Sequence, residues 1–92
     1  MGIKTGVMTF NMHKKSVQQL QQDFSAAFEK MGVNSGSQSK DFVVLHLQEC
    51  KDASVTLEKL KKNGLNHDYD LVQQHSLSQR TGWASSNLLT VV

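Results

Sequence analysis

Proline is absent from this chain of 92 residues, and cysteine, tryptophan and tyrosine occur once each. The lone cysteine, Cys50, has no partner for an internal disulfide, and a zinc cluster built from several thiolates is excluded. Nothing in the sequence therefore marks an oxidising compartment, and we expect a cytoplasmic protein. No internal repeat or linker divides the sequence, so we expect residues 1–92 to form a single domain.

Long apolar runs and long charged runs are also missing. No stretch approaches the roughly 20 apolar residues that a membrane-spanning helix needs, and the start lacks the order of a secretion signal. The net charge is +2, and the basic residues are scattered as short pairs such as Lys14-Lys15 and Lys61-Lys62. Scattered pairs are typical of solvated helix faces and suit an anionic ligand only weakly.

What is present is the composition of a globular protein, with 38% hydrophobic and 20% charged residues. Four stretches have the character of strands. Residues 3–10 read as a largely buried strand, and the unbroken apolar run at residues 42–47 predicts a central strand buried on both faces. Two further strands, starting at residues 69–72 and covering 88–92, flank the polar stretch 78–86 and are expected to pair antiparallel.

Two helices are predicted between these strands. Ser16 and Gln19 form a capping box that begins an amphipathic helix, and Gly32 supplies its C-terminal cap. Asp52 can cap a second, lysine-rich helix that stops at Asn63-Gly64. The expected order is β-α-β-α-β-β, which is an α/β fold.

Two of the predicted strands end in polar residues. One strand ends within Met8-Thr9-Phe10-Asn11-Met12, and the other lies in the segment 41–49. Taken alone, Asn11 could simply turn the chain, and Glu49 could be a solvated carboxylate. Adjacent strands of an α/β sheet, however, bring their ends together at the crevice where ligands bind. Asn11 and Glu49 would then supply hard oxygen ligands suited to Mg²⁺, which usually takes one or two protein carboxylates.

These two segments resemble a known family. Thr9-Phe10-Asn11 and Leu47-Gln48-Glu49 are similar to the Thr-Trp-Asn and Leu-Gln-Glu motifs of the endonuclease/exonuclease/phosphatase (deoxyribonuclease-I-like) superfamily. The resemblance runs through the final strand pair, and implies the amino-terminal half of a four-layer α/β sandwich. It also implies that Asn11 and Glu49 are catalytic and bind Mg²⁺ in a hydrolase of phosphate esters.

The departures from the family pattern matter equally. The later Asp-x-Asn motif and the Asp-His pair that activates water have no counterpart, and His67, Asp68 and Asp70 lie in the wrong place to replace them. The chain also ends inside an apolar strand, which predicts a truncated domain that is inactive alone. His13 stands where DNA-repair members tend to carry an acid, so the resemblance is closer to the inositol polyphosphate 5-phosphatase and sphingomyelinase branches.

The substrate implied by the resemblance is a phosphate ester: an inositol phosphate, a phospholipid or a nucleic acid. Two other interpretations stay open. In one, the chain is a non-catalytic interaction module that keeps the half-sandwich and pairs its exposed sheet with a second copy or a partner protein. In the other, an unrelated small α/β domain matches two short motifs by chance.

Other candidate residues receive structural interpretations. Gln48 is expected to support the site or cap its strand, and Cys50 to have a raised pKa that argues against a nucleophile. Trp83 and Arg80 could contact a base or lipid headgroup, although a lone tryptophan more commonly packs on the sheet.

The four histidines are not expected to form a catalytic or metal site. His46 alternates with apolar residues in a strand and is interpreted as a core histidine. The others are too widely spaced for a metal site and are assigned to the surface: His13, His67 and His75.

Overall fold

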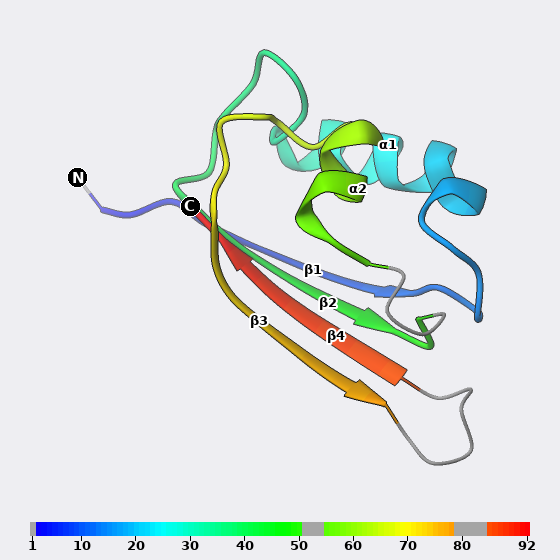
Figure 1. Cartoon of the computed structure of the whole chain (residues 1–92). Helices are drawn as coiled ribbons and strands as arrows, with labels where there is room; N and C mark the ends of the chain where they lie inside the picture. The colour runs from blue at the N-terminus through cyan, green and yellow to red at the C-terminus, as the bar shows by residue number, and fades with distance from the viewer. Residues whose placement is uncertain (1, 51–54, 79–84) are drawn as a thin grey trace.

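The computed structural model describes residues 2–50, 55–78 and 85–92. Figure 1 shows a four-stranded sheet with both helices on one of its faces. The strands are β1 (Thr5–Asn11), β2 (Phe42–Gln48), β3 (Leu71–Ser78) and β4 (Ser85–Val91), and the helices are α1 (Gln21–Met31) and α2 (Leu57–Lys62). The predicted α/β class and element order are confirmed.

The strands are arranged in the order β1-β2-β4-β3. β1 pairs parallel with β2, while β4 pairs antiparallel with both β2 and β3. The expected antiparallel pairing of the last two strands is therefore confirmed. β4 begins at Ser85, before the predicted start at Leu88, because polar residues of both strands still pair through the backbone, as at Ser76 opposite Asn87.

The core lies between the sheet and the two helices. On β2, Val43, Leu45 and Leu47 are fully buried beneath the helices. Phe24 and Phe28 of α1 are also fully buried, and their ring centroids are 5.8 Å apart. Burying side chains of this size contributes about 1.5–3 kcal/mol each, so this layer supplies most of the apolar stabilisation.

The other face of the sheet is not covered by any described residue. β1 alternates between buried and exposed positions, and Val7 is 66% exposed, so the prediction of a largely buried strand is wrong. Likewise, the alternate positions of β2, such as Val44 and His46, are only half-buried. An unbroken apolar run indicates an inner strand, which β2 is, but it does not reveal how many faces are covered.

We call this uncovered side the open face. Apart from Asn11 and Gln48, which lie on the same side at the ends of β1 and β2, its side chains are those that alternate with the core positions along the four paired strands. They are Thr5, Val7, Thr9, Phe42, Val44, His46, Gln73, His75, Leu77, Ser86, Leu88 and Thr90.

The start and end of the first helix follow the predicted signals. The Ser16 N–H donates to Gln19 Oε1 at 2.8 Å, and the Gln19 N–H donates to Ser16 Oγ at 3.3 Å. A 3-10 turn, η1 (Gln18–Leu20), comes first, and regular α geometry begins only at Gln21. Gly32 ends the helix with a φ of 72°, the left-handed conformation expected of a C-terminal cap.

The second helix begins with a different cap. Thr56 Oγ1 accepts a hydrogen bond from the Lys59 N–H at 3.3 Å, while Asp52 lies outside the described residues. The helix stops at Asn63-Gly64 as predicted. Tyr69 precedes β3 instead of opening it, because its side chain turns inward and its hydroxyl donates to the Lys40 carbonyl at 2.6 Å. No helix in the described ranges combines the length and apolarity needed to cross a membrane.

Candidate functional site

Asn11 and Glu49 lie at one rim of the sheet, where the parallel strands β1 and β2 end side by side. Asn11 is paired with Gln48 in the strand register, so the next residue, Glu49, is within reach of its side chain. Asn11 Nδ2 donates a hydrogen bond of 2.6 Å to Glu49 Oε2. The two candidate residues, far apart in the sequence, are thus in direct contact.

The loops that follow the two strands are joined by hydrogen bonds around this contact. The His13 N–H donates to Asn11 Oδ1 at 2.9 Å, which fixes the orientation of the Asn11 amide. The Met12 N–H donates to the Gln48 carbonyl and the Lys14 N–H to the Glu49 carbonyl, both at 2.8 Å. Gln48 therefore supports the site through its backbone.

The backbone at this rim is held in an uncommon conformation. Glu49 and His13 have φ values of 50°, and Lys14 has a φ of 62°. A left-handed conformation costs an L-residue roughly 1–2 kcal/mol, so three such residues persist only because the surrounding bonds hold them. Strained residues of this kind cluster at functional sites.

The Glu49 carboxylate has one oxygen available for a cation. Glu49 is half-buried, and its Oε2 receives the Asn11 amide. Among the described residues none donates a hydrogen bond to Oε1. Because Asn11 Oδ1 accepts from the His13 N–H, Asn11 holds the carboxylate through Nδ2, and Oε1 is the atom of Glu49 that could contact a metal ion.

Few metal-ligating side chains surround Glu49 in the part of the chain that the structure describes. Within the described ranges, no three His, Cys, Asp or Glu side chains gather around one point. A single carboxylate is compatible with Mg²⁺, because this ion often keeps several waters and completes its shell with substrate phosphate. A site of this composition would be weak and open to solvent.

Cys50 follows Glu49 but faces the core. Its thiol donates to the Leu47 carbonyl at 3.2 Å, and burial raises the pKa of Cys50 to about 11. A thiol with so high a pKa is almost entirely protonated at neutral pH. The expectation that Cys50 is no nucleophile agrees with this environment.

The histidines lie outside the site. His13, His67 and His75 are exposed, as predicted, but the assignment of His46 to the core is wrong. His46 and His75 both pair with Leu88 and so belong to the open face. Their proximity depends on how three strands pair, which strand periodicity alone cannot give. Arg80 and Trp83 lie outside the described residues.

Comparison with known proteins identifies no relative of this chain. No protein-family model, curated protein or solved structure matches the chain. The contact between Asn11 and Glu49, with the two motifs that carry these residues, is consequently what any functional assignment must explain.

Proposed function

We propose that this chain is the amino-terminal segment of a Mg²⁺-dependent phosphoesterase and forms one half of its catalytic site. The observation that carries the proposal is the 2.6 Å hydrogen bond between Asn11 and Glu49 at the carboxyl ends of two parallel strands. Ligands of α/β sheets bind at such strand ends. The amide and carboxylate there match the motifs that resemble those of the endonuclease/exonuclease/phosphatase superfamily.

The residues of this half-site have distinct roles in the proposal. Glu49 would hold Mg²⁺ through Oε1, and Asn11 Nδ2 keeps the carboxylate from turning away. The His13 N–H locks the Asn11 amide in the orientation that this task needs. When bound, the ion would polarise a phosphate ester and offset charge on its oxygens.

Water activation is not assigned to this segment. The later family motifs that supply it have no counterpart in the sequence, so we expect the segment to be inactive alone. Its substrate would be a phosphate ester: an inositol phosphate, a phospholipid or a nucleic acid. Selectivity among these substrates comes from pockets that loops form, and the residues of the half-site do not belong to such loops.

The open face supports a four-layer arrangement for the complete domain. None of its twelve side chains carries a permanent charge, and Val7, Leu77 and Leu88 are 66%, 58% and 40% exposed. A sheet face in contact with water normally carries polar and charged side chains. A second sheet with helices on its outer side would cover this face and complete the sandwich.

Stability measurements in Mg²⁺ test the half-site. A ligand that binds only the folded state raises the free energy of unfolding by about 1.4 kcal/mol at ten times its dissociation constant. We expect millimolar Mg²⁺ to raise the midpoint of thermal unfolding of the wild-type chain. Glu49→Gln removes the charge but keeps the shape, and should abolish this rise.

Glu58→Gln is the matched control, because Glu58 is an exposed carboxylate in the first turn of α2. This variant should respond to Mg²⁺ as the wild type does. An equal response in all three proteins, or none in any, would contradict the proposal, because a specific site at Glu49 predicts that only Glu49→Gln differs.

The open face also favours the second candidate function, a non-catalytic interaction module. In that case a partner protein or a second copy would cover the exposed apolar side chains. The two functions differ at the rim: an interaction module needs no response to Mg²⁺ at Glu49. A chain that associates through the open face and ignores millimolar Mg²⁺ would favour the module.

A further inference from the structure

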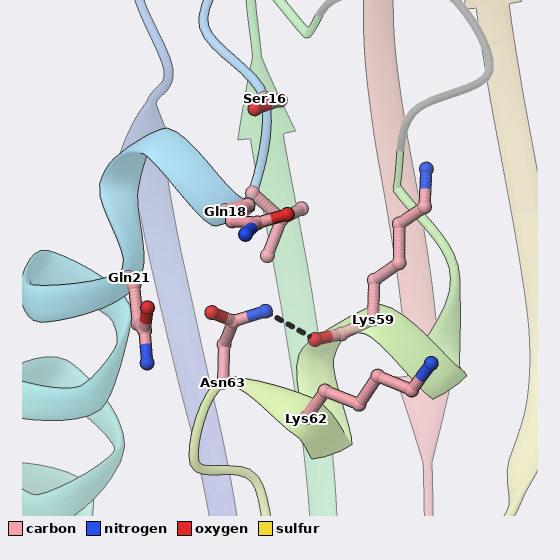
Figure 2. Close-up of a pocket in the computed structure, with 7 residues that line it drawn as sticks. Ser16, Gln18, Gln21, Lys59, Lys62 and Asn63 are labelled. Carbon is pink, nitrogen blue, oxygen red and sulfur yellow. Dashed lines mark hydrogen bonds between the residues drawn. The ribbon is translucent and has the colours of Figure 1, made fainter.

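A second feature lies in the helix layer, apart from the rim at Asn11 and Glu49. A hollow of about 400 Å³ opens between the start of the first helix and the end of α2. Figure 2 shows Gln18 and Gln21 on one side of it and Asn63 on the other. The remaining lining residues are Ser16, Val17, Lys59 and Lys62.

Most of the residues that line the hollow have polar side chains. Of its seven residues, only Val17 is apolar, and no aromatic ring is present on which a base could stack. Three carboxamides and one hydroxyl can each donate and accept hydrogen bonds, a combination that suits the hydroxyls of a sugar. A volume of about 400 Å³ falls within the range of small-molecule sites.

Asn63 supplies a buried acceptor without a partner. The residue is only 9% exposed, and its Nδ2 donates to the Lys59 carbonyl at 2.6 Å. No described residue donates to its Oδ1, which Figure 2 shows on the side toward α1. A buried carbonyl oxygen normally has a donor, so a hydroxyl or a water is expected at this point of the hollow.

Two positive charges stand at the rim of the same hollow. Lys59 and Lys62 are exposed and form no ion pair with any residue in the described ranges. Their ammonium ends extend away from α1 in Figure 2, but exposed side chains change rotamer within nanoseconds. Both can therefore turn toward an anion that occupies the opening.

We propose that this hollow binds a phosphorylated sugar. A sugar hydroxyl donates to Asn63 Oδ1, other hydroxyls bond to the carboxamides of Gln18 and Gln21, and the phosphate lies between Lys59 and Lys62. The site is separate from the half-site at the strand ends and does not depend on Mg²⁺.

Side-chain amide NMR of the intact chain tests the proposal, with glucose 6-phosphate as the probe. Its addition should shift the amide signals of Gln18, Gln21 and Asn63. Glucose offers only the hydroxyls and inorganic phosphate only the anion. Each should therefore bind at least about tenfold more weakly than glucose 6-phosphate. The double variant Lys59→Gln with Lys62→Gln should weaken binding of glucose 6-phosphate by at least about tenfold.

Lys61→Gln is the control for charge, since it removes one positive charge from the same last turn of α2 at a residue that does not line the hollow. It should retain binding, and Glu49→Gln should also retain it. No shift in these amides at tens of millimolar, roughly the weakest affinity worth measuring, would overturn the proposal. Equal weakening by Lys61→Gln would also overturn it, as would equal binding of inorganic phosphate.

Discussion

At the scale of single residues, Glu49 combines a polar contact with a strained backbone. Its φ is 50°, and its carboxylate accepts the Asn11 amide at 2.6 Å. Glycine adopts this conformation without the steric cost that Cβ imposes. Replacing Glu49 by glycine would therefore relieve the strain but would also remove the carboxylate.

This conflict predicts an order of stability for two variants. Glu49→Ala and Glu49→Gly both lose the bond to Asn11, but only the glycine variant loses the strain. We expect Glu49→Gly to be more stable than Glu49→Ala by about 1 kcal/mol in urea unfolding. Equal stability, or a more stable alanine variant, would show that the strain is not present in solution.

Cys50 predicts a pH dependence of stability. Burial raises the pKa of its thiol from 9.0 to about 11, so the unfolded chain loses this proton first as the pH rises. The contribution of the thiol to the free energy of unfolding is complete below pH 9, and about 2–3 kcal/mol is lost as the pH rises through 11. Cys50→Ala should lack this loss.

The measurement is urea unfolding of both proteins across that pH range. Lysine and tyrosine groups titrate there as well, so the difference between wild type and Cys50→Ala isolates the thiol. A difference that stays constant with pH would mean that the thiol ionises equally in the folded and unfolded states.

At the scale of elements, Gly32 is the position on which the end of α1 depends. A Cβ at Gly32 would collide with Ser39 Oγ, whereas a Cβ at Gly36 would meet nothing within 4 Å. Their φ values are similar, 72° and 77°, so Gly36 is a control for backbone strain alone. The comparison separates strain from crowding.

We expect Gly36→Ala to cost about 1 kcal/mol and Gly32→Ala at least about 2 kcal/mol. The added cost has a local cause, because Ser39 Oγ donates to the carbonyls of Met31 and Gly32 at 3.0 Å and would have to move. Chemical unfolding of both variants measures the difference. Similar losses would indicate that the segment after α1 adjusts freely.

Local signals were sufficient to predict the capping bonds of the first helix and the ends of both helices. The capping box at Ser16 and the glycine at Gly32 act through neighbouring residues, and both are present in the structure. The cap of α2 at Thr56 was not predicted, because aspartate and threonine side chains make the same capping bond and the sequence pattern does not choose between them. Tyr69 was misplaced, since its partner, the Lys40 carbonyl, is distant in sequence.

At the scale of the whole molecule, the prediction of the candidate site depended on strand adjacency. Asn11 and Glu49 could be placed at one rim because strand ends in α/β sheets converge. The open face could not be predicted, because the run containing Val44 and His46 is equally compatible with one covered face or two. The contact between open-face histidines and Leu88 required the full strand order.

The open face predicts association of the isolated chain. Leu88 lies at its centre, paired with His46 on one side and His75 on the other. Leu88→Lys places a charge there and should leave the fold intact while preventing association. Light scattering during gel filtration at increasing concentration measures this.

Gln22→Lys adds the same charge on the exposed side of α1 and should associate as the wild type does. A wild-type chain that stays monomeric up to hundreds of micromolar, roughly the range of weak specific contacts, would contradict this prediction. Loss of association in both variants would point to net charge instead of the open face.

The most direct measurement of the half-site is an NMR titration of the chain with Mg²⁺. The half-site predicts selective shifts of the Asn11 side-chain amide, which donates to the proposed ligand carboxylate, and of the backbone amide of Glu49, which carries that carboxylate. Glu49→Ala should lose the shifts. A folded chain whose Asn11 and Glu49 signals ignore millimolar Mg²⁺ would contradict the account and leave the interaction module as the better assignment.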